Sequence, residues 1–343
     1  MITVDIMAGV LWLAVTAYAL LGGADFGGGF WDLTAGDPDK GAPIRARIEH
    51  SIGPVWEANH VWLIFVLVVL WTAFPAGFAS VASTFYIPLT FAAFGIILRG
   101  SGFAFRKLAG TVSSQRFFGA TFALSSILTP FFLGAVAGGI ASGRVPVGIE
   151  RGAIFTSWIN PTSILGGILA VATCAWLAAT YLTVDSMRSG EQDLAEAFRK
   201  RALYSGVFLG VMTILGIGVL DYDAHILFEG LITKALPLVI ISILAGLISM
   251  ALLWKRSYKL VRQFGALAIV AIIWGWGVGQ FPKILVGGPT LAQVAAPPVV
   301  LHAMLWSVVI GGLFLIPSLG YLFFLFNSLS RESKDSNRQS LSH

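Results

Sequence analysis

Long apolar stretches, separated by short polar segments that often contain Pro or Gly, recur along the whole chain of 343 residues. Most reach about 20 residues, the length that a helix needs to cross a hydrocarbon core of roughly 30 Å. Because backbone groups in lipid must be paired within the segment, such stretches predict helices. Nine membrane-spanning helices are expected, at 6–31, 54–75, 79–104, 117–142, 159–184, 202–220, 230–254, 263–282 and 298–327.

The composition supports this interpretation and excludes other classes of protein. Hydrophobic residues make up 57% of the chain and charged residues 11%, and the mean hydropathy is +0.83. A net charge of +5 that is spread over loops does not indicate a nucleic-acid-binding surface. Cys174 is the only cysteine, which excludes disulfides within the chain and cysteine metal sites. We therefore expect an all-α polytopic membrane protein.

The basic residues predict the direction of the spans. Seventeen of the 22 Lys and Arg residues fall on one side of the nine-span topology and four on the other, while Arg99 lies within a span. Such an excess is typical of the cytoplasmic side. We therefore expect a single membrane domain at 1–329 with its N-terminus outside, followed by a cytoplasmic polar tail at 330–343.

Three ionisable residues fall within the first three predicted spans, where a purely structural helix would carry Leu or Val. Each such group costs on the order of 2.5–3.5 kcal/mol on insertion scales, so these residues commonly mark ion, proton or redox pathways. With the predicted directions, Asp25, Glu57 and Arg99 lie at one depth near the cytoplasmic side. His60 lies one turn after Glu57 on the same helix face. This predicts an intramembrane cluster open to the cytoplasm; the alternative is that Asp25 and Arg99 separately reach the lipid headgroups.

Two histidines within predicted spans are candidates for haem ligands. His60 lies in the cytoplasmic half of its span, whereas His302 lies near the outer start of the last span. A bis-histidine haem needs two imidazoles that face each other across one iron, so these positions disfavour such a site. A haem held by His60 alone is also disfavoured. We expect His60 to hydrogen-bond within a polar cluster, where a neutral imidazole can pass protons.

Six motifs, in this order, carry a resemblance to a known family. They are Gly22-Gly-Ala-Asp-Phe-Gly-Gly-Gly29, Ser51-Ile-Gly-Pro-Val-Trp-Glu-Ala-Asn-His-Val-Trp-Leu63, Leu98-Arg-Gly-Ser-Gly-Phe-Ala-Phe-Arg106, Asn160-Pro-Thr-Ser-Ile-Leu-Gly-Gly167, Trp276-Gly-Val-Gly-Gln-Phe-Pro282 and Thr290-Leu-Ala-Gln-Val-Ala-Ala-Pro-Pro298. In this combination the chain resembles subunit II of cytochrome bd-type quinol oxidases from end to end.

The resemblance implies two four-helix bundles, at about 1–142 and 159–282, and a peripheral ninth helix at about 298–327. It implies a haem-bearing partner, subunit I, with haem b and haem d groups and the quinol site, in a bacterial inner membrane. Quinol would be oxidised and oxygen reduced to water there. This chain would stabilise subunit I and line proton and oxygen routes to its oxygen-reducing haem. A small single-helix accessory subunit and a structural quinone on this chain are both compatible with the sequence.

The motifs also imply roles for single residues. Glu57 falls where the family has an acidic proton-route residue, usually Asp, and Asp25 matches the second Asp of the family's Asp-Gly-Phe-Asp pattern. Arg99 matches the Arg of the third-helix motif, and Trp62 matches a tryptophan near a proposed oxygen access point. The predicted proton pathway therefore consists of Glu57, Asp25, His60 and Arg99.

Two features leave alternatives open. Gly22 replaces the first Asp of the family pattern, which affects any proton route that needs both acids. A proton-coupled secondary transporter is the alternative function, but transporters usually show internal repeats and helices broken at the bilayer midplane. We find no clear repeat between 1–142 and 159–282, and the predicted intramembrane charges lie at one end of the spans. Ubiquinol and menaquinol are both compatible with the sequence.

Overall fold

The computed structural model describes residues 2–53, 56–146 and 152–340. Within these ranges, nine helices are long and apolar enough to cross a membrane, which confirms the all-α, nine-span prediction. These helices are α1 (Ile2–Leu33), α3 (Trp56–Ala73), α5 (Tyr86–Leu108), α6 (Val112–Ala141), α7 (Pro161–Ser189), α8 (Gln192–Asp223), α10 (Leu236–Trp254), α11 (Val261–Gln280) and α13 (Pro298–Ser340).

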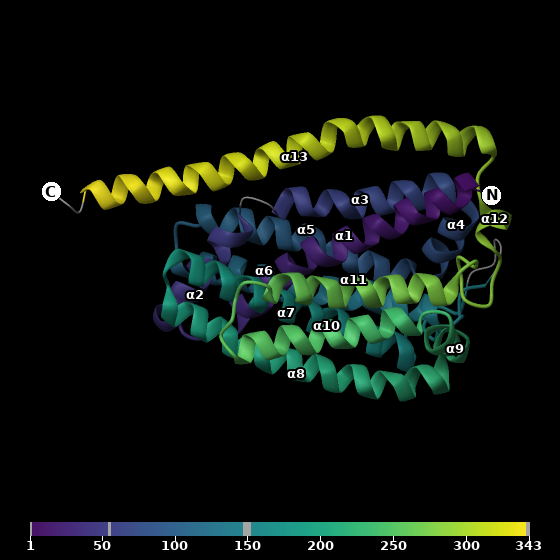
Figure 1. The fold of residues 1–343 in the computed structure, drawn as a ribbon, viewed down its shortest axis with the longest axis horizontal. Helices are drawn as coiled ribbons and strands as arrows, with labels where there is room; N and C mark the ends of the chain where they lie inside the picture. The colour runs from purple at the N-terminus through teal and green to yellow at the C-terminus, as the bar shows by residue number, and fades with distance from the viewer. Residues whose placement is uncertain (1, 54–55, 147–151, 341–343) are drawn as a thin grey trace.

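Four shorter helices were not predicted. They are α2 (Pro38–Ile52), α4 (Pro75–Thr84), α9 (His225–Thr233) and α12 (Leu291–Val294). Helix α2 lies at one end of the molecule, whereas α4, α9 and α12 lie at the opposite end (Figure 1). Two predicted spans began too early, inside α4 and α9, because apolar residues continue through the breaks at Phe85 and Ala235.

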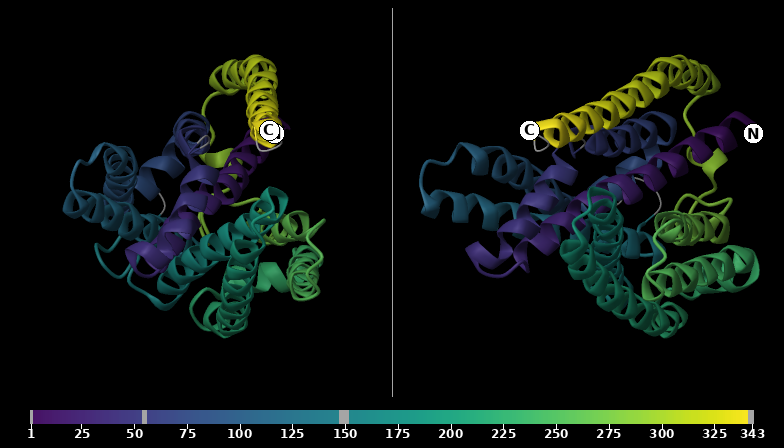
Figure 2. Two further views of the ribbon diagram at one scale, coloured as in Figure 1. Left: turned by 90° about the vertical axis from the view of Figure 1, so that its left-hand side faces the viewer. Right: turned by 60° about the vertical axis from the view of Figure 1, so that its left-hand side comes forward.

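Helix α1 is central to the packing. It contacts α3, α6, α7, α11 and α13, while α5 packs on α6, α8 on α7, and α10 on α11. In the end-on view, α1 passes between the helices that precede α7 and those that follow it (Figure 2, left). Because α1 contacts members of both sequence groups, it is shared by them and is not confined to the first group.

Three successive glycines allow these neighbours to approach α1 closely. A Cβ atom added at Gly27 would overlap the carbonyl oxygen of Cys174 on α7. One at Gly28 would overlap Ile52 on α2, and one at Gly29 would overlap Ser126 on α6. Small residues permit close helix contacts in lipid, where dispersion and polar contacts replace the hydrophobic effect. The glycine-rich motif therefore serves helix packing on three sides of α1.

An ion pair between Arg144 and Asp223 connects chain segments at the end of the molecule that carries α9 and α12. Arg144 donates through Nη1 and Nη2 to the Asp223 carboxylate at the end of α8, at 3.0 and 2.5 Å. The same carboxylate accepts from the backbone N and the hydroxyl of Thr162, at 3.1 and 2.6 Å. A carboxylate at a helix N-terminus is favourable. Asp223 therefore joins the end of α8 to the start of α7.

Helix α13 lies on the outside of the molecule, along α1 and α3 (Figure 1). It continues to Ser340, beyond the predicted end of the apolar span near residue 327. The chain begins at the end that carries α12 and finishes beyond the end that carries α2 (Figure 1). The two termini thus lie at opposite ends, as an odd number of spans requires.

Candidate functional site

Asp25, on α1, is a buried carboxylate with 3% of its surface exposed. Its Oδ2 accepts a hydrogen bond of 2.8 Å from Nδ2 of Asn59, a buried side chain on α3. Burying a charge is costly unless polar groups compensate it. The Asp25–Asn59 hydrogen bond therefore gives Oδ2 of the carboxylate a partner and links α1 to α3.

Arg99, on α5, is 1% exposed and connects four helices. Its Nε donates to Oγ of Ser126 on α6 at 3.2 Å, and its Nη1 lies 3.2 Å from Nε2 of His60 on α3. The guanidinium carbon lies 5.0 Å from the ring centre of Phe26 on α1 and 5.2 Å from that of Phe122 on α6. Such cation–π contacts favour a buried guanidinium. Snorkelling to the headgroups, the alternative for Arg99, does not fit this burial.

His60 is enclosed by aromatic rings, with ring centres at 6.0 Å for Tyr18, 5.4 Å for Phe26 and 6.4 Å for Trp56. Because a guanidinium only donates hydrogen bonds, His60 Nε2 must accept from Arg99, which places the imidazole proton on Nδ1. The lone pair that would bind iron therefore faces a cation. This environment does not fit a haem ligand.

His302 does not complete such a site either. It lies exposed at the start of α13, with Nε2 3.4 Å from Oγ1 of Thr3. His60 lies at the start of α3, which is far along the molecule from the start of α13 (Figure 1). Among the described residues, no group of three or more His, Cys, Asp or Glu side chains is arranged to hold a metal ion.

Tyr18 joins the buried polar groups from one turn before Gly22. A Cβ atom at Gly22 would lie 2.8 Å from Cε2 of the Tyr18 ring, so the absence of a side chain at Gly22 makes room for that ring. Three buried polar atoms here have no hydrogen-bond partner in the described part of the chain: Tyr18 OH, His60 Nδ1 and Arg99 Nη2. Ordered water commonly satisfies such atoms. We call Tyr18, Asp25, Asn59, His60, Arg99 and Ser126 the polar cluster.

Glu57 does not belong to the polar cluster. It lies in the first turn of α3, its side chain is exposed, and it makes no hydrogen bond or ion pair with other described residues. Successive helix positions turn by about 100°, so Glu57 lies about 200° from Asn59 and about 60° from His60 around α3. Asn59 is therefore buried in the bundle, His60 lies at its edge, and Glu57 points outwards. Glu57 starts an exposed stripe at helical spacing that continues through Val61, Ile64, Val68 and Trp71.

Trp62 lies beside this stripe on α3. Its side chain is half-buried, and its ring centre is 6.2 Å from that of Phe65. The structure thus brings together Asp25, His60 and Arg99 of the predicted site, and places Glu57 and Trp62 outside the polar cluster.

Asp32, at the end of α1, is a second buried carboxylate that sequence reasoning missed. It is 4% exposed and pairs with Nη1 of Arg106 at 2.7 Å and with Nε of Arg45 at 3.3 Å. Asp32 follows Asp25 by seven residues, which places both on one helix face, and this spacing was the available signal. Tyr18, Asn59 and Ser126 were also not among the predicted site residues.

The chain is similar to known proteins along nearly its whole length. Residues 3–326 match the family described as cytochrome bd terminal oxidase subunit II. The chain is 24% identical to the cytochrome bd ubiquinol oxidase subunit 2 of Bacillus subtilis over 285 residues, which cover 80% of this chain and 81% of that protein. It is 23% identical to the cytochrome bd-I ubiquinol oxidase subunit 2 of Escherichia coli K12, covering 99% of this chain and 100% of that protein.

A putative cytochrome bd menaquinol oxidase subunit II of Bacillus subtilis is 23% identical, with 92% of each chain covered. A solved structure of the bd oxidase from Geobacillus thermodenitrificans shares the fold, with a TM-score of 0.73 at 22% identity, over 95% of this chain and 99% of that one. None of these relatives is a transporter. Because the family match spans residues 3–326, the chain belongs to the cytochrome bd terminal oxidase subunit II family.

Proposed function

We propose that this chain works as subunit II of a quinol oxidase and carries protons through its polar cluster towards subunit I. Subunit I would hold the haem b and haem d groups and the quinol site. The haems of the partner would supply electron transfer and oxygen reduction. Reducing one oxygen molecule to water consumes four protons, so a buried site of that reaction needs a proton route. The residues of this chain would hold and pass those protons.

The burial of ionisable groups in one intramembrane site is the observation that carries this proposal. Asp25 and Arg99 are 3% and 1% exposed, and His60 lies against Arg99. Apolar side chains would stabilise the same helix packing without the cost of burying charge, so these groups are better explained by function. The three unpaired polar atoms of the cluster are positions where bound water would complete a hydrogen-bonded chain.

We assign the end that carries α2 to the cytoplasm. Lys40, Arg45 and Arg47 lie on α2, and Arg106 lies near the end of α5. The excess of basic residues at this end favours the cytoplasmic side, which puts the N-terminus outside and the C-terminus inside. Protons would then reach the polar cluster from the cytoplasm.

Asp32 marks the start of the proposed route. It lies between two partly exposed arginines at the cytoplasmic end, about 10.5 Å along α1 from Asp25. That separation is too long for direct transfer, so water must bridge the two carboxylates. From Asp25 the proton would continue through water beside the His60 imidazole, whose Nδ1–H has no partner among the described residues and can hydrogen-bond that water while Nε2 stays bound to Arg99.

Tyr18 would supply the protonatable group that is missing at Gly22. The family pattern has an acid at that position, whereas here the Tyr18 ring fills the space and its hydroxyl lies buried. A hydroxyl both donates and accepts hydrogen bonds, so it can pass a proton without becoming charged. The route would therefore not need a second acid at Gly22.

Glu57 would deliver protons to subunit I. An ionisable side chain within a span usually faces protein or water and not lipid. Glu57 is exposed, and its Cβ lies roughly 5–6 Å from that of His60, one turn later on α3. We therefore propose that the exposed stripe of α3 faces subunit I, with Trp62 beside it at the oxygen access point. A small accessory helix and a structural quinone remain compatible with this arrangement.

Replacing Glu57 by Gln in the complete oxidase tests the proposal. The substitution keeps the size and removes the charge, and Glu229→Gln is a matched control because Glu229 is 64% exposed at the other end. We expect Glu57→Gln to lower oxygen consumption by about tenfold or more, since 1.4 kcal/mol on the limiting barrier gives that factor. The haem absorbance spectrum should stay unchanged. Normal turnover by Glu57→Gln would remove Glu57 from the route.

A further inference from the structure

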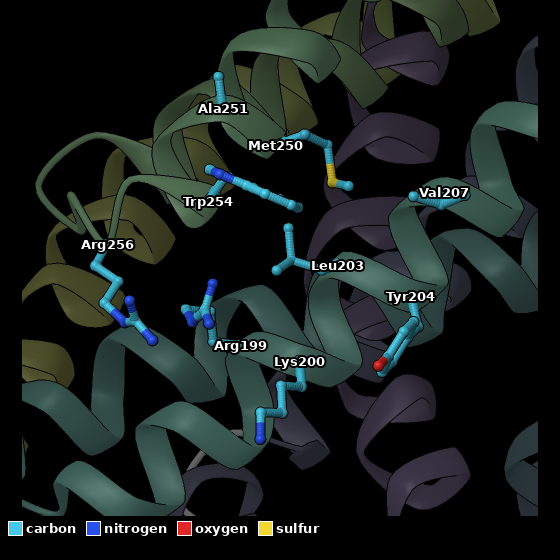
Figure 3. A pocket seen from close by; sticks show the side chains of 9 residues that line it. All are labelled: Arg199, Lys200, Leu203, Tyr204, Val207, Met250, Ala251, Trp254 and Arg256. Atoms are coloured by element: carbon cyan, nitrogen blue, oxygen red, sulfur yellow. The ribbon is translucent and has the colours of Figure 1, made fainter.

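A groove of about 720 Å³ opens between α8 and α10 (Figure 3), at the end of the molecule that carries α2 (Figure 1). This volume lies within the roughly 300–1,000 Å³ of many ligand sites. Leu203 and Val207 from α8, with Met250 and Trp254 from α10, form its apolar part. Lys200 and Arg256 lie at one end of the groove, away from Val207 (Figure 3).

The groove is open towards the surroundings of the helices. Tyr204 is 76% exposed, Val207 60% and Trp254 74%, so the described part of the chain does not cover them. Trp and Tyr side chains near the ends of spanning helices are typical of the boundary between hydrocarbon and headgroups. The apolar part of the groove therefore lies where acyl chains run, and its basic end where headgroups lie.

Positive charge is in excess at the basic end. Arg199 is buried and uses Nε and Nη2 for Glu196, at 2.8 and 2.6 Å. Arg256 is 63% exposed and reaches Glu196 only at 3.3 and 3.4 Å. Lys200 is exposed and forms no ion pair with described residues. Two arginines thus share one carboxylate and Lys200 adds a third positive charge, so the cations of Lys200 and Arg256 are available to an anion.

The backbone of Arg256 gives an independent reason to assign a role to its side chain. Arg256 has φ of 54°, the only positive φ of a non-glycine residue in the described ranges. It follows the end of α10, where Arg256 N donates to Leu253 O and Ser257 N to Leu252 O. This hydrogen-bond pattern is the Schellman motif, whose left-handed position usually holds Gly or Asn. Arginine is an unfavourable residue at a left-handed backbone position, so its presence there points to a function of the guanidinium.

We infer that this groove binds an anionic phospholipid of the leaflet at the α2 end. Its phosphate would lie between Lys200 and Arg256, and an acyl chain would follow Leu203 and Val207. Basic pockets between spanning helices on the cytoplasmic side suit anionic headgroups. A neutral lipid or a quinone would leave the excess positive charge uncompensated.

Photolabelling of the complete oxidase in phosphatidylcholine vesicles tests this inference. The probe is a small proportion of phosphatidylglycerol with a diazirine in one acyl chain, and adducts are mapped by peptide mass spectrometry. We expect adducts at 203–207 and 250–254 that unlabelled phosphatidylglycerol removes. For Lys200→Gln/Arg256→Gln we expect roughly 30-fold weaker binding, the factor that two basic groups near an anionic surface contribute.

Lys40→Gln/Arg188→Gln is the matched control, because it removes the same charges from exposed positions at the same end, outside the groove. It should label as the wild type does. Ala251→Trp keeps the charges but fills the groove, so it should also lose the adducts. This variant replaces the double variant in the test if the double variant fails to assemble. Equal labelling by a diazirine phosphatidylcholine, displacement by a quinone and not by phosphatidylglycerol, or undiminished labelling of Lys200→Gln/Arg256→Gln would overturn the inference.

Discussion

Gly27→Ala is expected to destabilise the protein more than a Gly→Ala substitution at any other position of the glycine-rich motif. The added Cβ would overlap the carbonyl oxygen of Cys174 and lie 2.7 Å from Cβ of Ala178, both on α7. Carbon atoms pack at about 3.5–4.0 Å. The obstructing atom at Cys174 belongs to the backbone, so no rotamer change relieves the overlap and α7 itself must move.

The size of the effect follows from two opposing contributions. Overpacking costs about 1–3 kcal/mol, and a clash with backbone belongs at the upper end of that range. Replacing Gly by Ala within a helix returns roughly 0.5–1 kcal/mol. The net loss is therefore about 2 kcal/mol, which corresponds to a midpoint lowered by roughly 4–8 °C on the scale of medium-sized domains.

Thermal unfolding of the purified complex, followed by size-exclusion chromatography, measures this loss. Gly9→Ala is the matched control on the same helix, because a Cβ at Gly9 meets nothing within 4 Å. Gly28→Ala should fall between the two, since it meets the flexible end of the Ile52 side chain. If Gly27→Ala melts together with Gly9→Ala, the close contact of α1 with α7 is not present in the protein.

Three further substitutions test other parts of the account. Asp223→Ala should lower the free energy of unfolding by about 2 kcal/mol, a value discounted for the 34% exposure of its partner Arg144, and should lower the melting temperature accordingly. Asp221, which is 57% exposed, is the control, and Asp221→Ala should leave the melting temperature unchanged. Asp32→Asn should lower both oxygen consumption and the melting temperature, because it removes the charge that holds two arginines; unaltered consumption would exclude Asp32 from the proton route. Tyr18→Phe should slow oxygen consumption in a complex with normal haem content, and a normal rate would exclude the hydroxyl from the route.

Hydropathy was sufficient to predict the nine spanning helices because the bilayer demands long apolar segments. It did not reveal α4 or α9, since apolar residues continue through Phe85 and Ala235, where the helices break. The central position of α1 was also not predictable from hydropathy. That position depends on which helices pack against Gly27, Gly28 and Gly29, and a glycine-rich motif does not indicate which helices these are.

Part of the predicted site lies together in the structure, because the positions of ionisable residues along their predicted spans give the depth of each residue in the membrane. Depth predicted Asp25, Glu57 and Arg99 at one level, with His60 one turn after Glu57. The structure places Asp25, Arg99 and His60 together, but not Glu57. The direction in which a side chain points depends on helix rotation, which explains why Glu57 faces outwards. Neutral residues such as Tyr18 and Ser126 carry no comparable signal, because hydroxyl groups are common in spanning helices.

Oxygen consumption and proton uptake by the Asp25→Asn oxidase in liposomes test the central claim most directly. Asp5→Asn is the matched control, since Asp5 lies exposed at the other end of the same helix. With haem content verified by absorbance, we predict that Asp25→Asn lowers both rates by about tenfold or more, while Asp5→Asn keeps them. An Asp25→Asn oxidase that consumes oxygen and takes up protons as fast as the Asp5→Asn oxidase would contradict a proton route through the polar cluster.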